Sequence, residues 1–138
     1  MEAWRERLAP VGLLILRVGL GGMMLAAHGL GKLTGFAEKS ETFGDPLGVG
    51  SATSLALAVF AEFFCSLAVV FGLATRLAAV PLVITMLVAA GIVHADDPWG
   101  RKEFPLLYAI GFATLIFTGP GKLSLDRLIA RRRGRATK

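Results

Sequence analysis

The chain has 138 residues and a formal net charge of +5, with 54% hydrophobic residues and 18% charged residues. Its mean hydropathy of +0.64 is too high for a water-soluble domain of this size, which would have to expose much of that apolar surface. The apolar residues form long blocks that are apolar nearly all round, whereas a soluble bundle needs helices with a polar face. The composition therefore excludes a soluble domain and predicts an all-α integral membrane protein.

Four apolar blocks follow one another along the chain. A bilayer core about 30 Å thick needs roughly 20 apolar residues per helix, and each block meets or nearly meets that length. We expect one domain over residues 1–138, in which a four-helix transmembrane bundle is followed by a basic tail at 122–138. The expected helices cover about residues 11–31, 52–74, 77–95 and 104–121.

The first block is predicted to be a retained helix and not a cleaved signal peptide. Arg17 interrupts it, and Lys32 follows without a clear small-residue cleavage site. After it, "GFAEKSETFG" at 35–44 is amphipathic and predicts a short interfacial segment between the first two helices. With Phe36 and Phe43 dipping inward, this segment is placed to cover an external pocket. At the other end of the chain, Ser124 and Asp126 predict the start of a short surface helix.

The basic residues predict the orientation of the bundle, because they favour cytoplasmic helix ends. Four of them fall on the side away from the termini: Lys32, Lys39, Arg101 and Lys102. Ten fall on the side of the termini: Arg5, Arg7, Arg76, Lys122, Arg127, Arg131, Arg132, Arg133, Arg135 and Lys138. Both termini are therefore expected in the cytoplasm. The basic tail predicts attraction to anionic lipid, and we expect no nucleic-acid partner.

Ionisable residues interrupt the first two helices. Arg17, His28 and Lys32 share a stripe of the first helix with several glycines, so this stripe is expected to face the bundle interior. Glu62 lies in the middle of the second helix and is the expected partner of Arg17, since an unpaired charge at such depth costs several kcal/mol. The pair either has a functional role or only fixes the register of two helices.

A second polar group is expected at the outer ends of the helices. Histidine, carboxylate and tyrosine side chains at similar depth suit a proton relay or the head group of a quinone. The alternative is that they are ordinary interfacial residues. No metal site is expected, because no ligand pair has a close spacing such as HxxxH. The candidate ligand-binding residues are Arg17, His28, Lys32, Glu62, His94, Glu103 and Tyr108.

The sequence also argues against several kinds of chemistry. Cys65 is the single cysteine, so a dithiol relay within the chain is ruled out. No motif for a flavin, a haem or an iron–sulfur cluster is present, and "GPGKLS" at 119–124 lacks the spacing of a phosphate loop.

The order of several short motifs resembles the DoxX family, from about Leu13 to Leu128. They are "LRVGLGGMMLAAHGLGKL", "AEFFCSLAVVFGLATRLAAVPL" and the closing "FTGPGKLSLD". The resemblance implies a small four-helix protein of the bacterial cytoplasmic (inner) membrane, with polar positions at Arg17, His28, Lys32 and Glu62. The family name is linked to the membrane subunit of thiosulfate:quinone oxidoreductase. If the chain takes part in redox chemistry, the resemblance implies that a partner or a bound quinone carries the electrons, and the cofactor stays open between them.

Three hypotheses for the function remain open, and they leave open whether the chain is itself an enzyme. The first is a quinone-facing or anchoring subunit of a thiol- or sulfur-linked redox complex, with a soluble or membrane redox partner. The second is a small proton-coupled transporter that uses Glu62. The third is a structural or assembly protein without chemistry of its own. The glycine-rich helix faces also suit a homo-oligomer.

Overall fold

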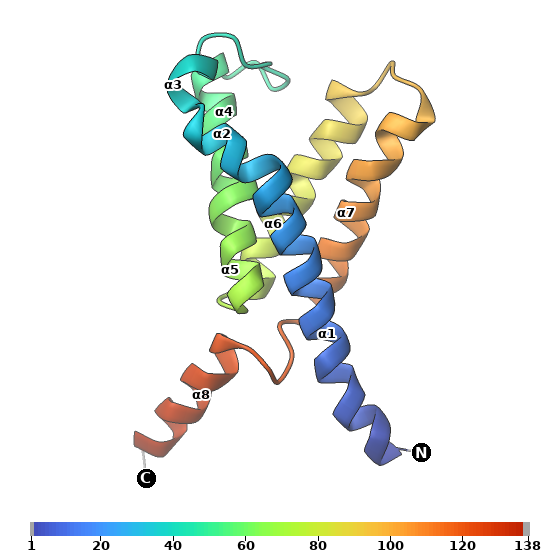
Figure 1. Ribbon diagram of the computed structural model, residues 1–138, viewed down its shortest axis with the longest axis vertical. Coiled ribbons are helices and arrows are strands. Elements are labelled where there is room, and N and C mark those ends of the chain that lie inside the picture. Colours follow the sequence, from blue (N-terminus) through green and yellow to red (C-terminus); the bar gives the residue numbers. More distant parts are fainter. Residues whose placement is uncertain (1, 137–138) are drawn as a thin grey trace.

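The computed structural model describes residues 2–136, and within that range it consists of helices and their connections, with no strands (Figure 1). Short π-helical turns, labelled η, interrupt two of the long helical segments and end a third. The four long segments are α1 (Glu2–Met24) with η1 (Leu25–Gly29) and α2 (Leu30–Thr34); α4 (Ser51–Val59) with η2 (Phe60–Cys65) and α5 (Ser66–Phe71); α6 (Thr75–Val88) with η3 (Ala89–Val93); and α7 (Trp99–Thr118). Two shorter helices are α3 (Phe36–Lys39), in the first connection, and α8 (Leu125–Ala136), in the tail.

Three of the long segments are long and apolar enough to cross a membrane. They cover Leu8–Thr34, Ser51–Phe71 and Thr75–Val93. Helix α7 has 20 residues, but its beginning carries three charged residues, so its apolar part runs only over 104–118. The prediction of an all-helical membrane protein is confirmed, with three spans shown by length and composition. A fourth span formed by α7 stays a proposal.

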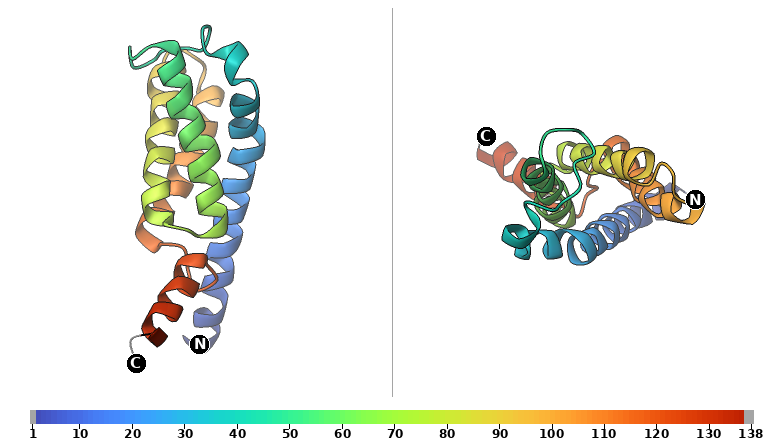
Figure 2. Two further views of the ribbon diagram at one scale, coloured as in Figure 1. Left: turned by 90° about the vertical axis from the view of Figure 1, so that its left-hand side faces the viewer. Right: turned by 90° about the horizontal axis from the view of Figure 1, so that it is seen from above.

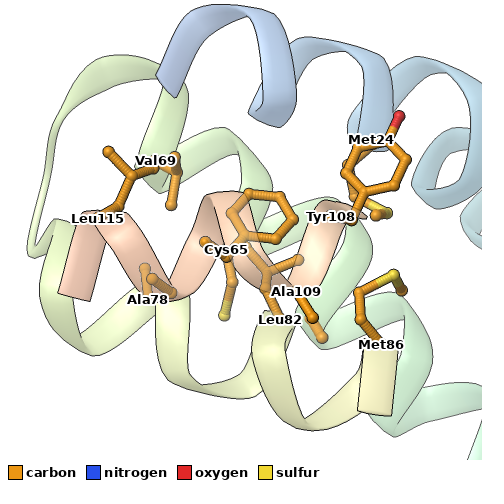
Figure 3. Packing of buried hydrophobic residues seen from close by; sticks show 12 residues of the cluster. Met24, Cys65, Val69, Ala78, Leu82, Met86, Tyr108, Ala109 and Leu115 are labelled. Atoms are coloured by element: carbon orange, nitrogen blue, oxygen red, sulfur yellow. The ribbon is translucent and has the colours of Figure 1, made fainter. Parts of the chain in front are cut away.

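The long segments pack around a shared apolar core. α1 packs against α5 and α7, and α6 packs along α7. Met24, Leu82, Phe112 and Leu115 are fully buried within this core, part of which appears in Figure 3. Figure 2 shows α8 and the start of α1 extending beyond the bundle, so the described chain begins and ends at the same end of the molecule.

At the terminal end of the bundle, α5 stops in a turn that only glycine fits well. Gly72 has φ +71°, and its N–H donates to the Val69 carbonyl at 3.0 Å, while Leu73 N–H donates to the Ala68 carbonyl at 2.9 Å. These two bonds form a Schellman motif, which satisfies carbonyls at a helix end. A Cβ at Gly72 would lie 2.5 Å from Arg17 Nη1. Both the backbone conformation and the close approach of Arg17 therefore require glycine.

Asp126 fastens the tail to the beginning of α6. Its carboxylate accepts hydrogen bonds from Ala74 N at 2.8 Å and Thr75 N at 3.3 Å, and its own N–H donates to the Gly72 carbonyl at 3.0 Å. Ser124 Oγ accepts from Arg127 N at 3.3 Å, at the start of α8. The predicted helix start at Ser124 and Asp126 is thus confirmed. Asp126, however, caps α6 across the chain and not α8 alone.

Replacing Asp126 with alanine is expected to lower the free energy of unfolding by about 1 kcal/mol, because the first N–H groups of α6 lose a carboxylate acceptor. The measurement is thermal unfolding of detergent-purified protein. Asp96 is an exposed aspartate in the opposite loop, so Asp96→Ala is the matched control. An equal loss of stability in both variants would contradict the capping role.

Candidate ligand cavity

A cavity of about 610 Å³ lies between the long segments, at the end away from the termini. Figure 1 shows α4 and α6 diverging towards this end. Ala61, Met86 and Tyr108 belong to the core cluster and also line the cavity, so the cavity lies directly on the core. In Figure 3, Tyr108 lies beside Met24, at one end of the cluster.

An ion pair between the first and second segments lies at the cavity wall. Lys32 Nζ in α2 is 2.5 Å from Glu62 Oε2 in η2, and the Glu62 residue is only 5% exposed. Both residues line the cavity. The sequence predicted that Glu62 would pair with Arg17, and that prediction is wrong.

Arg17 instead binds backbone carbonyls at the terminal end of the bundle. Its guanidinium donates to the Val70 carbonyl at 2.7 Å, to the Val69 carbonyl at 3.4 Å, and to the carbonyl of Leu123. Two of these carbonyls lie at the end of α5, where the helix dipole favours a cation, and the Val69 carbonyl also accepts the N–H of Gly72. Arg17 is buried, and among residues 2–136 it forms no ion pair with a carboxylate. It does not line the cavity, so its place among the pocket residues is corrected.

The Lys32–Glu62 pair lies beside the closest approach of the first two segments. At Gly29 in η1, a Cβ would lie 2.3 Å from the Glu62 carbonyl oxygen and 2.8 Å from Phe63 Cα. These neighbours are backbone atoms and cannot rotate away. The absence of a side chain at Gly29 therefore allows η1 and η2 to pack closely, one turn before Lys32.

Two aromatic rings bring the first and fourth segments together at the cavity. His28 and Tyr108 both line it, and their rings meet edge to face with centroids 6.2 Å apart. Tyr108 is itself held between Phe104, at 5.5 Å, and Phe112, at 6.0 Å between centroids. This packing fixes the position of the phenol ring at the cavity.

His94 connects the cavity to the loop between the third and fourth segments. It lines the cavity, and its Nδ1 lies 2.6 Å from Asp97 Oδ2, while Arg101 Nη1 lies 3.6 Å from the same oxygen. The hydrogen bond with His94 and the charge of Arg101 lower the pKa of Asp97. Glu103, the remaining candidate, is exposed in α7 and outside the lining residues.

The loop between the first and second segments covers part of the cavity, and an aspartate holds it in place. Asp45 accepts hydrogen bonds from Ser54 Oγ at 2.7 Å, Gly50 N at 2.8 Å and Val49 N at 3.0 Å. These bonds lower the pKa of Asp45, the bond from Ser54 most. Phe43 lines the cavity as the lid prediction required, but Phe36 lies in the short helix α3, outside the lining.

Sequence reasoning missed the small residues that leave room for the cavity. Ala58 and Ala61 line it on the second segment, one on either side of Phe60. Alanine in a membrane helix also indicates ordinary helix packing, so this signal is weak. Among residues 2–136, no group of three or more histidine, cysteine or acidic side chains is arranged to hold a metal ion.

Comparison with known proteins gives a family and several relatives. The DoxX family model matches residues 12–95. The chain is 31% identical to "Inner membrane protein YqjF" of Escherichia coli, over 90% of this chain and 96% of the relative. It is 32% identical to "Putative oxidoreductase CatD" of Bacillus subtilis, over 86% of this chain and 87% of the relative. A third relative is "Uncharacterized membrane protein Rv3486" of Mycobacterium tuberculosis, at 29% identity over 89% and 84%. No solved structure matches the chain.

Proposed function

The chain belongs to the DoxX family and is a multi-pass protein of the bacterial inner membrane, and from this premise we propose that it is a redox-complex subunit that holds a quinone head group in the cavity. The redox role is supported by the relative named "Putative oxidoreductase CatD". The termini and the basic tail face the cytoplasm in this proposal, so the cavity lies towards the external side.

The observation that carries the proposal is the cavity itself. It has about 610 Å³ of space, within the range of small-molecule sites, and its lining combines many apolar side chains with a few polar ones. The residues fit a quinone, because carbonyl oxygens on an apolar ring need hydrogen-bond donors within an apolar wall. Lys32, His28 and Tyr108 are the donors that would hold those oxygens. A bound quinone supplies a carrier for two electrons and two protons.

The chain's own residues are assigned to binding and to proton movement. Glu62 is a buried carboxylate at the cavity, held by Lys32, and is the group we assign to holding a proton beside the ligand. His94 and Asp97 lie between the cavity and the external loop, where we assign them to proton exchange with water. Cys65 is buried and single, so the electrons are assigned to a thiol- or sulfur-linked partner.

Replacing Lys32 with glutamine is expected to lower the bound quinone by about tenfold, because the head group loses a charged donor and Glu62 loses its counterion. The measurement is solvent extraction and mass spectrometry of detergent-purified protein. Lys122 is exposed at the opposite end of the bundle, so Lys122→Gln is the matched control and should keep the quinone. Wild-type protein that carries no isoprenoid quinone, purified from quinone-rich membranes, would contradict the proposal.

A second candidate, a proton-coupled transporter, is favoured by the buried carboxylate of Glu62 at an accessible cavity. A pH-sensitive dye inside proteoliposomes separates the two functions. Collapse of an imposed pH gradient by wild type but not by Glu62→Gln, in protein without quinone, would favour transport. If neither result is obtained, an assembly role is the remaining hypothesis.

A further inference from the structure

One side of the cavity is formed by side chains that also face outward. Leu57 and Phe60, from the second segment, and Ile84, from the third, all line the cavity. They are nevertheless 49%, 52% and 55% exposed. A side chain that lines a cavity and is half exposed lies at an opening and not in a closed wall. We call these three residues the seam.

The seam lies within the membrane-spanning part of the fold. Its residues belong to the apolar spans Ser51–Phe71 and Thr75–Val93. Phe60 follows Ser51 by nine residues and Ile84 precedes Val93 by nine, so each lies about 14 Å from the external end of its span. The two antiparallel segments therefore present the seam at a common depth, near the middle of the hydrocarbon layer.

The first loop borders the cavity at its external side. Phe43, Pro46 and Leu47 of the first loop line the cavity there. The Asp45 hydrogen bonds to Val49, Gly50 and Ser54 hold that loop against the start of α4. Leu47 of this loop is 51% exposed, and Val93 and Phe104, which also line the cavity, are 56% and 60% exposed. The cavity therefore has an edge at its outer end as well, and the seam is its edge at mid-span.

We infer that the cavity opens sideways into the bilayer through the seam, and that its ligand is a lipid-soluble molecule with a single hydrocarbon tail that leaves the cavity between α4–η2 and α6. The inference rests on the proposed function for the head group, a quinone ring at Lys32 and Glu62. The hydrocarbon tail and its path through the seam go beyond that proposal. A tailed ligand dissolved in the bilayer reaches such a site without crossing the head-group region.

The first test examines the opening without any quinone. Single-tryptophan proteins are made by replacing Trp4 and Trp99 with phenylalanine and introducing Met86→Trp or Phe112→Trp. Met86 lines the cavity and Phe112 does not, although both are buried. In vesicles of phosphatidylcholine brominated in mid-chain, we expect quenching of the tryptophan at 86 but not at 112. Equal protection of both tryptophans would overturn the lateral opening.

The second test examines the tail, with 2,3-dimethoxy-5-methyl-1,4-benzoquinone and its decyl derivative as probes of folded protein in nanodiscs. Phe60→Ser is expected to weaken binding of the decyl compound about tenfold and to leave the tail-less compound unchanged. Phe64 is 51% exposed on the same segment but outside the cavity lining, so Phe64→Ser is the matched control.

The outcomes separate the two proposals. Equal binding of both compounds, or equal effects of Phe60→Ser and Phe64→Ser, would overturn the tail path and leave the quinone site standing. Failure of wild type to bind either compound would reject the quinone head group, and the bromolipid result would then decide the lateral opening alone.

Discussion

Replacing Gly29 with alanine is expected to lower the free energy of unfolding by about 2–3 kcal/mol. A Cβ at this position would lie 2.3 Å from the Glu62 carbonyl oxygen, so η1 and η2 must move apart. This separation also pulls Lys32 away from Glu62 and is expected to reduce quinone retention. The measurements are thermal unfolding in detergent and mass spectrometry of bound quinone on the same preparations.

Gly22 is the matched control for this variant. It lies in α1, and a Cβ there would meet nothing within 4 Å. Because alanine favours the helix more than glycine does, Gly22→Ala is expected to be neutral or slightly stabilising. If Gly29→Ala were as stable as Gly22→Ala, the close packing of η1 on η2 would be wrong.

Replacing Arg17 with methionine is expected to cost about 3–5 kcal/mol of stability, because several carbonyls in a low-dielectric environment lose their donor together. The guanidinium joins the end of α5 to the tail, through the carbonyls of Val70 and Leu123. The tail should therefore detach, and α8 should become easier to cleave with trypsin. Thermal unfolding and limited proteolysis in detergent measure the two effects.

Two further variants make the result at Arg17 specific. Arg17→Lys keeps the charge but offers a compact ammonium in place of the planar fork, so it should recover only part of the stability. Arg127→Gln removes an exposed arginine at the same end and should have little effect. A full rescue by lysine would show that charge alone, and not the set of carbonyl contacts, stabilises this end.

The long helices could be predicted from the sequence because burial in lipid leaves a direct compositional signal. The expected segment 52–74 corresponds to the structure's helix over Ser51–Phe71, and 77–95 corresponds to Thr75–Val93. The first helix begins well before residue 11, because α1 starts at Glu2 and continues through Pro10. Hydropathy places the apolar part of a helix, but a polar extension beyond the membrane leaves no such signal.

The Lys32–Glu62 ion pair could not be predicted from the sequence. It depends on the register of two helices and on the fact that an arginine can bind backbone carbonyls in place of a carboxylate. A search for opposite charges paired Arg17 with Glu62, but backbone carbonyls at the end of α5 satisfy the arginine equally well. Glu62 is then free to pair with Lys32. The π turns η1 and η2 contain His28 and Glu62, and each inserts an extra residue that ideal helical spacing does not anticipate. His28, His94 and Tyr108 all line the cavity at one end of the bundle, where the order of the apolar blocks led us to expect them.

The contact between Arg17 and Leu123 also bears on the order of assembly during synthesis. The two residues are 106 positions apart, and Asp126 adds its bonds to Ala74 and Thr75 from 52 and 51 positions along the chain. A nascent chain that has inserted its first three helices therefore holds a buried cation with an incomplete set of acceptors. Such long-range closure comes late, because the chain between the partners must first be ordered. The residues just before α8 thus complete the set of acceptors around Arg17. A chain cut short of them leaves the guanidinium with only the carbonyls of Val69 and Val70.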